Sequence, residues 1–453
     1  MALYFPLCGF SMRRFLLFLV CFCLLHLSSC YLHPALGQGP WKDDDSNDPL
    51  NNLLGVLALI PPSARGTLDL TFGSGGYISL DPSGASRDDF CDYLLQSGDG
   101  SFLTGGTYDS GSSPDFTLFR LTPTGTLDTS FGNSGLASVD LSGGPDLGLS
   151  ASFDFFGNIY MVGEAGGLGV AYFDANGNPI YSFSGNSYFV DSIGEGGVRI
   201  FPNIDGSFVV AATQMIVEST DFMVVRYLSD GSLDTSFGSG GTGAADFSSE
   251  DYLNTAVRRD SGGYLLAGST YAGPSGYIVA IAAFDSSGNL DASFSGDGLF
   301  TLDLGMDDNI YALYPLFGGG LLAAGYSDDD ILLIRLNADG SLDSSFGNGG
   351  YVTIDIAGDI DDAQTIVVQW DGRIILGGDA MVSGIQQFVL VRFNTDGSLD
   401  TSFGSNGIVT ADLPAGGFDF QLGGLVLQPD GKVVLSGTYS DSSNADCLVA
   451  RYE

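Results

Sequence analysis

The sequence Gly-Ser-Leu-Asp-Thr-Ser-Phe-Gly at residues 397–404, called the repeat motif below, recurs along the chain. Related versions begin at residues 66, 125, 231, 288 and 340, and a degraded version begins at residue 177. These starting points are separated by 59, 52, 54, 57, 52 and 57 residues. The period is typical of propeller blades and too long for leucine-rich, ankyrin or tetratricopeptide repeats. We therefore expect seven copies of one structural unit.

Each unit contains short apolar segments separated by turn residues. In the last unit these segments cover residues 408–412, 424–428, 432–437 and 447–452, and Asp-Gly at residues 430–431 lies between the second and the third. Such segments predict antiparallel strands, and Asp-Gly is a strong signal for a tight hairpin. The sequence therefore predicts an all-β fold, a seven-bladed β-propeller with four-stranded antiparallel blades over residues 66–453.

The two ends of the repeat region complement each other. The chain stops at Glu453, where the repeat motif would come next, and the first unit begins inside the motif at Gly66. The last blade therefore lacks a piece that the N-terminal end can supply. We expect the N- and C-terminal segments to close the ring together.

Three kinds of residue occupy fixed positions in all units. A phenylalanine, able to wedge between neighbouring blades, occurs at residues 72, 131, 183, 237, 294, 346 and 403. A small residue, expected where blades crowd, occurs as Gly106, Gly163, Ala212, Gly268, Gly325, Gly378 and Gly437. An aspartate, eight or nine residues after the phenylalanine, occurs as Asp81, Asp140, Asp191, Asp246, Asp303, Asp355 and Asp412. These aspartates should form a ring on one face, either as a cation-binding rim or, as we favour, as acceptors for local turns.

An arginine precedes the motif aspartate by eight residues in four units: Arg120 and Asp128, Arg226 and Asp234, Arg335 and Asp343, Arg392 and Asp400. The degraded unit lacks both and has Tyr172 and Ile180 instead. Joint retention and joint loss predict a bidentate ion pair that clamps the turn. Ala283 with Asp291 is an exception, because the aspartate remains without the arginine. Ring closure offers Arg451 the partner Asp69.

The extended motif Asp-Gly-Ser-Leu-Asp-Thr-Ser-Phe-Gly-x-x-Gly, followed by a short strand that ends in aspartate, resembles the delta-60 repeat family of exported bacterial proteins. The resemblance covers residues 66–453 and departs from the family pattern at Ile180 and at Ser184-Gly185. It implies a β-propeller and an exported location. It implies no established activity and no catalytic residue.

The N-terminal region is typical of an export signal. Arg13 and Arg14 precede an apolar run at residues 15–25, which is shorter than the roughly 20 residues that a membrane-spanning helix needs. Residues 1–29 therefore read as a signal peptide.

Leu-Ser-Ser-Cys at residues 27–30 resembles the lipobox of bacterial lipoproteins, which implies lipidation of Cys30. Ordinary signal cleavage nearby is the alternative. Tyr31 follows the cysteine where an aspartate would favour the inner membrane, so the resemblance implies an outer-membrane anchor. Residues 30–65 are expected to be a flexible tether rich in Asp, Pro and Gly.

The formal charge of the chain is -39, and without residues 1–29 it is -41, with 13 basic and 54 acidic side chains. Such a field repels nucleic acid and anionic lipid headgroups and attracts cations and basic partners. We expect a monomer with an unidentified protein or glycan partner and no nucleic acid.

Residue types for catalysis are scarce in the repeats. The histidines are His26 and His33, both before the propeller, so Ser-His-Asp, Cys-His and histidine-metal sites are excluded from it. Glutamate occurs only at residues 164, 195, 218, 250 and 453, and no carboxylate pair stands out. We expect no catalytic residue and no enzyme.

Calcium is the one cofactor that the composition leaves open. Acidic residues cluster at Asp328, Asp329 and Asp330 and at Asp359, Asp361 and Asp362. Carboxylates are the ligands that calcium prefers, although Asp-Gly turns on a solvated acidic surface explain the same clusters.

Cys91 and Cys447 are the cysteines of the predicted propeller. Ring closure makes their blades neighbours, and export places them in an oxidising compartment. Two alternatives remain open at this point: a disulfide bond, opposed by the fanning apart of adjacent blades, or two buried free thiols.

The leading hypothesis is a non-enzymatic, lipid-anchored binding or scaffolding propeller of the cell envelope. A calcium-dependent carbohydrate or adhesion module is the alternative. A glycan or lactone hydrolase is the third hypothesis, and it has the least support from the residues.

Overall fold

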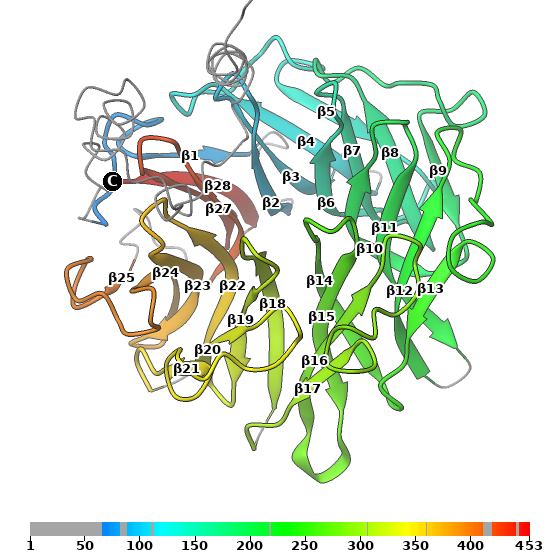
Figure 1. The fold of residues 1–453 in the computed structure, drawn as a ribbon. Coiled ribbons are helices and arrows are strands. Elements are labelled where there is room, and N and C mark those ends of the chain that lie inside the picture. Colours follow the sequence, from blue (N-terminus) through cyan, green and yellow to red (C-terminus); the bar gives the residue numbers. More distant parts are fainter. Residues whose placement is uncertain are drawn as a thin grey trace, which may run out of the picture.

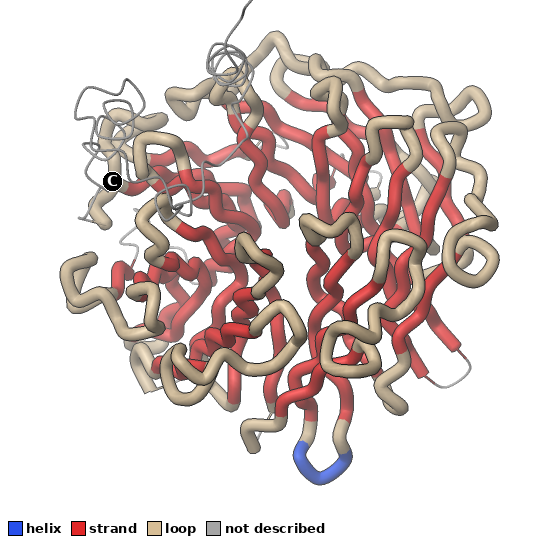
Figure 2. The backbone as a smooth tube through the Cα atoms, viewed as in Figure 1, coloured by secondary structure: helices blue, strands red, loops and turns tan. Residues whose placement is uncertain are grey.

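The computed structural model describes residues 66–81, 88–109, 113–216, 219–305, 307–358, 360–410, 419–440 and 444–453. Within these residues, 28 strands form seven four-stranded antiparallel sheets, with a short 3-10 turn, η2 (Gly273–Ser275). The sheets are arranged around a ring (Figure 1 and Figure 2). The chain is therefore a seven-bladed β-propeller, as predicted. The signal peptide, Cys30 and the tether lie outside the described residues.

Consecutive strands are neighbours in every blade. Blade one contains β2 (Asp89–Gln96), β3 (Phe102–Asp109), β4 (Pro114–Leu121) and β5 (Leu136–Val139). Blade two contains β6 (Leu147–Phe153), β7 (Ile159–Glu164), β8 (Leu168–Phe173) and β9 (Tyr188–Asp191). Blade three contains β10 (Glu195–Pro202), β11 (Phe208–Ile216), β12 (Ser219–Tyr227) and β13 (Thr242–Ala245). Blade four contains β14 (Asp251–Arg258), β15 (Tyr264–Tyr271), β16 (Tyr277–Phe284) and β17 (Leu299–Leu302).

Blade five contains β18 (Asp308–Pro315), β19 (Leu321–Ser327), β20 (Asp330–Leu336) and β21 (Tyr351–Ile354). Blade six contains β22 (Asp361–Val368), β23 (Ile374–Val382), β24 (Ile385–Phe393) and β25 (Ile408–Thr410). Blade seven contains β26 (Asp419–Leu427), β27 (Val433–Ser440), β28 (Ala445–Tyr452) and, from the other end of the domain, β1 (Tyr77–Leu80). The first strand of each blade contacts the first strands of both neighbours, so these strands surround the ring axis.

The two ends of the domain close the ring, as predicted. β1 pairs antiparallel with β28, from Tyr77 opposite Ala450 to Leu80 opposite Cys447. Beyond this ladder, the backbone N–H of Asp69 donates to the Arg451 carbonyl at 2.8 Å, and the N–H of Glu453 donates to the Thr67 carbonyl at 2.8 Å. The outermost strand of blade seven is therefore supplied by the N-terminal segment.

The repeat motif couples each blade to the next. All seven motif phenylalanines are at most 3% exposed. The glycine of the following motif lies directly over the phenylalanine ring: a Cβ on Gly125 would lie 2.6 Å from Phe72, and Gly125 has a φ of +78°. Only glycine satisfies both the close approach and the left-handed backbone. The phenylalanine of each motif is therefore covered by the glycine of the next motif around the ring.

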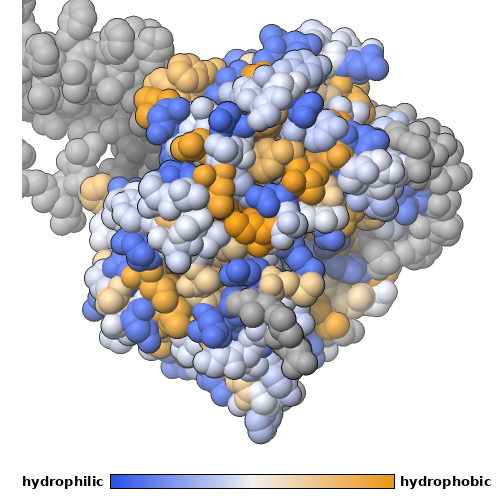
Figure 3. Space-filling view, turned by 90° about the vertical axis from the view of Figure 1, so that its right-hand side faces the viewer, coloured by the Kyte–Doolittle hydropathy of each residue, from blue (hydrophilic) through white to orange (hydrophobic). Residues whose placement is uncertain are grey.

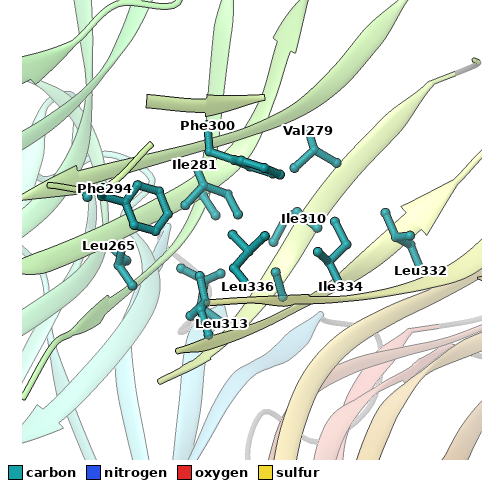
Figure 4. Packing of buried hydrophobic residues seen from close by; sticks show 14 residues of the cluster. Leu265, Val279, Ile281, Phe294, Phe300, Ile310, Leu313, Leu332, Ile334 and Leu336 are labelled. Carbon is teal, nitrogen blue, oxygen red and sulfur yellow. The ribbon is translucent and has the colours of Figure 1, made fainter. Parts of the chain in front are cut away.

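Apolar clusters fill the spaces between blades. Between blades four and five, Leu265, Ile281 and Phe294 pack in one cluster with Ile310 and Leu336 (Figure 4). Burying one such side chain contributes about 1.5–3 kcal/mol. Repetition of this packing around the ring gives the fold its core.

The recurring small residues lie where strands crowd, and most of the crowding comes from within the same blade. Each of them pairs with the first strand of its own blade beside a β-bulge, as Gly325 does opposite Ile310, next to the bulge between Ile310 and Ala312. A Cβ on Gly325 would overlap the carbonyl oxygen of Asn309. The main crowding is therefore within the blade, where the bulged strand bends toward its neighbour. At Gly163 and Gly437 a phenylalanine of the preceding blade, Phe116 or Phe388, lies close as well.

The surface mixes residue types. Figure 3 shows one side of the molecule, on which hydrophobic residues are scattered between hydrophilic ones. Among the described residues, no helix is long and apolar enough to span a membrane.

Candidate functional site

The structure brings together all five arginine–aspartate pairs named from the sequence. The shortest N–O distances are 2.8 Å for Arg120 and Asp128, 2.7 Å for Arg226 and Asp234, 2.7 Å for Arg335 and Asp343, 2.8 Å for Arg392 and Asp400, and 2.8 Å for Arg451 and Asp69. In the pairs of Arg226 and Arg335, Nε and Nη2 both lie 2.7–2.8 Å from the same oxygen, Oδ2, so two nitrogens share one oxygen where two parallel bonds were expected. Oδ1 accepts the backbone N–H and hydroxyl two residues later, as from Ser130 to Asp128 at 3.0 and 2.6 Å.

The arginines also join neighbouring blades. Arg335 stacks on the motif phenylalanine of its own blade, with 4.5 Å from Cζ to the ring centroid of Phe346. Its Nη1 donates to the Thr395 carbonyl in the next blade at 2.6 Å. Arg120 makes the same bond to the Ala175 carbonyl at 2.6 Å. The clusters at Arg120, Arg335 and Arg451 therefore satisfy their charges locally and clamp two blades, which is a structural role.

The unit with Ala283 keeps its ion pair through a residue that the sequence did not indicate. Arg259, at the turn after β14, contacts Asp291 at 2.6 Å. Two further basic residues were missed: Lys432 contacts Asp69, and Arg373 contacts Asp400 at 3.1 Å. All three lie on the hairpin between the first and second strands of a blade, so the position of that hairpin was the available signal.

The degraded unit replaces the ion pair with aromatic packing. Tyr172, in the arginine position, stacks on Tyr160 with 4.0 Å between ring centroids and lies 6.1 Å from the motif Phe183. Its hydroxyl donates to Asp154 at 2.8 Å. Since no charged partner is needed, both the arginine and the aspartate can be absent.

A disulfide bond joins Cys91 in β2 to Cys447 in β28, with 5.3 Å between the Cα atoms. The fanning of blades is no obstacle here, because β2 contacts β26, β27 and β28 near the ring axis. Gly423 allows this approach, since a Cβ there would overlap the Cys91 carbonyl oxygen. Blades one and seven are thus linked covalently across the closure of the ring.

The rim aspartates act mainly as turn acceptors. Carboxylate oxygens of Asp140, Asp191, Asp246, Asp303 and Asp355 accept backbone N–H groups two or three residues later, at 2.5 to 3.1 Å. Asp412 lies outside the described residues. These bonds favour the turn interpretation over a continuous cation-binding rim.

The acidic clusters named as calcium candidates do not bring three ligand atoms together among the described residues. None of Asp328, Asp329, Asp330, Asp361 and Asp362 belongs to a group of three ligand atoms within 4.8 Å of one another, and Asp359 is not described. Asp361 and Asp362 are successive strand residues and so face opposite sides of the sheet. Asp361 instead accepts the backbone N–H of Ile356 at 2.6 Å.

Three other acidic groups do meet this distance, and each joins strands of adjacent blades: Asp81, Asp89 and Asp446; Asp115, Asp140 and Asp146; Asp221, Asp246 and Asp251. Sequence reasoning found only the rim member of each. The other members lie in the third strand of one blade and at the start of the first strand of the next, and only the ring geometry brings them together.

A polar pocket of about 360 Å³ lies between blades three and four. Arg226, Arg258 and Tyr264 are among its lining residues. Arg226 is paired with Asp234, and Arg258 donates to the Phe201 carbonyl at 3.0 Å and to Asn203 at 2.7 Å. The cations of this pocket are therefore already engaged in contacts within the protein.

The chain is a repeat-built β-propeller, and part of it matches a known family. Residues 98–131, 205–237, 319–346 and 369–403 match the family described as "Domain of unknown function (DUF5122) beta-propeller". Each matched segment ends at or near a motif phenylalanine. Among curated proteins, none is significantly similar in sequence.

Solved propeller structures resemble the chain at low identity. Sqt1 from Chaetomium thermophilum is 15% identical, with a TM-score of 0.41 over 82% of this chain and 97% of that one. Drosophila Semaphorin 2a is 10% identical, with a TM-score of 0.47 over 81% and 74%. Polysaccharide lyase Uly1 is 11% identical, with a TM-score of 0.46 over 87% and 95%.

Proposed function

We propose that the chain is a non-enzymatic binding or scaffolding propeller, exported and anchored to the bacterial envelope through lipid on Cys30. The main support for this proposal is the set of contacts that hold the ring closed. The motif charges are used to clamp blades together, and β1 and the disulfide bond between Cys91 and Cys447 close the circle. A rigid ring presents its loops to a partner at a low entropic cost.

Export is supported by the disulfide bond, since such bonds persist in oxidising compartments. The charge of -41 without residues 1–29 favours a partner with a basic surface. The tether at residues 30–65 would hold the propeller away from the membrane. The anchor rests on the sequence of residues 27–30.

Fractionation of cells that produce the full chain tests the anchor. Wild type should be found with membranes and be released by detergent, whereas Cys30→Ala should lose acylation and this attachment. Detergent-dependent attachment of the Cys30→Ala variant would remove the lipid-anchor proposal.

Cross-linking in intact cells tests the binding role. A defined envelope partner should be enriched with the full chain over an unrelated domain carrying the same anchor. Turnover of an envelope glycan by the purified protein would overturn the non-enzymatic assignment.

A further inference from the structure

Asp221, Asp246 and Asp251 meet at the junction of blades three and four. Asp221 lies in β12, Asp246 directly follows β13, and Asp251 begins β14. One carboxylate oxygen from each lies within 4.8 Å of those of the other two. The group therefore gathers three negative charges from two blades.

Hydrogen bonds leave much of this charge unsatisfied. Asp221 is 3% exposed, and its Oδ1 accepts no hydrogen bond. Asp251 is fully buried, and its Oδ2 accepts the backbone N–H of Phe247 at 2.9 Å while its Oδ1 accepts none. Among the described residues, every ion pair of a basic side chain involves other acids. A buried carboxylate without a partner is costly.

The pKa values reflect the same arrangement. Burial, together with the charge of Asp246, raises the pKa of Asp221. Burial raises the pKa of Asp251 to about 6, and the charges of Asp221 and Asp246 add to this effect. A bound cation would remove the repulsion that both shifts express.

The two equivalent groups differ from the group at Asp221 in the hydrogen bonds that their carboxylates accept. Asp146 has both oxygens occupied, because the N–H of Leu141 donates to Oδ2 and the hydroxyl of Ser142 donates to Oδ1, each at 2.6 Å. Asp446 accepts the Tyr439 hydroxyl at 3.0 Å and the Asn444 amide at 2.7 Å. The group at Asp221 has two buried carboxylate oxygens that accept no hydrogen bond, one on Asp221 and one on Asp251, whereas each of the other two groups has one.

We propose that Asp221, Asp246 and Asp251 bind a calcium ion that ties blade three to blade four. Calcium takes six to eight oxygen ligands at flexible geometry, so three carboxylates and water suit it. Magnesium demands stricter octahedral geometry, and zinc prefers the nitrogen and sulfur ligands that this group does not contain. An affinity of about 10⁻⁴ to 10⁻³ M, as in extracellular calcium modules, is expected. The site does not depend on the proposed partner.

Thermal melting and calorimetry of the full chain test the site. In about 10 mM calcium the melting temperature of wild type should rise by about 2–3 °C relative to chelator. Asp221→Asn and the exposed Asp246→Asn should each weaken calcium binding at least tenfold. In chelator, Asp221→Asn should melt at or above wild type, because a repelling buried charge has been removed.

Asp115→Asn is the matched control, since Asp115 occupies the equivalent strand position in blade one. It should retain the calcium response of wild type. The proposal is overturned if wild type neither binds calcium by calorimetry nor gains stability. It is also overturned if Asp221→Asn keeps the full response, if Asp115→Asn loses it equally, or if magnesium at the same concentration acts as strongly.

Discussion

At the scale of single residues, the same ion pair is placed in different surroundings around the ring. Arg392 is 1% exposed and Asp400 8%, whereas Arg120 is 17% and Asp128 24% exposed. Burial alone would raise the pKa of Asp400, but hydrogen bonds from Ser402 and the charges of Arg392 and Arg373 outweigh it and lower the pKa. The contribution of each arginine–aspartate pair to the free energy of unfolding should therefore increase with its burial.

Arg392→Ala should lower the free energy of unfolding by about 3 kcal/mol, because it leaves a buried carboxylate whose remaining cation, Arg373, is partly exposed. Arg120→Ala should cost about 1 kcal/mol or less, because solvent screens that pair. Urea unfolding measures both, and a double-mutant cycle with Asp400→Asn isolates the coupling. Equal costs for the two arginines, or no coupling between residues 392 and 400, would contradict the clamp.

At the scale of elements, the bulge in the first strand of each blade explains the recurring small residue. Gly325→Ala should destabilise the protein by about 2 kcal/mol or more, because the added Cβ meets a backbone carbonyl that cannot move freely. Ala212 is the natural exception, and its partner strand β10 has two register shifts instead of one. Ala212→Gly should therefore cost only about 1 kcal/mol. A neutral Gly325→Ala in urea unfolding would show that the crowding is unimportant.

The strands, the number of blades and the closure of the ring could be predicted from the sequence. The repeat period and the Asp-Gly hairpins can be recognised directly, and the repeat region ends where the motif with which it begins would come next. The ion pairs could be predicted because Tyr172 and Ile180 replace both partners in one unit. Arg259 was not predicted, because it reaches Asp291 from 32 residues away and only its place on a hairpin marks it. The group at Asp221 could not be predicted either, because its three aspartates meet only where two blades are packed together.

At the scale of the whole molecule, two sets of aspartates act on stability with opposite sign. Burial raises the pKa of Asp92 to about 7, and burial is also the main cause that raises the pKa of Asp362 to about 6. The folded state then holds protons that the unfolded chain releases. Stability from these residues is present at low pH and is lost as the pH rises through about 7.

The motif aspartates behave in the opposite way. Hydrogen bonds from Ser130, aided by the charge of Arg120, lower the pKa of Asp128, so its contribution is present above the unfolded value of 3.8 and is lost as the pH falls below it. We therefore expect the greatest free energy of unfolding between about pH 4 and pH 6, in chelator. Asp92→Asn should reduce the loss of unfolding free energy between the maximum and pH 8. It should leave the loss below about pH 4 unchanged. A wild-type maximum at pH 8 would contradict this account.

We propose that the chain forms an exported, lipid-anchored and covalently closed ring, and counting thiols tests all three properties. The chain has six cysteines: Cys8, Cys21 and Cys23 within residues 1–29, then Cys30, Cys91 and Cys447. Protein purified from the envelope and denatured without reductant should show no free thiol, because signal cleavage, acylation and the disulfide bond account for all of them. Reduction should expose two, from Cys91 and Cys447. Two free thiols before reduction would contradict the closed ring, and a third after reduction would contradict the anchor.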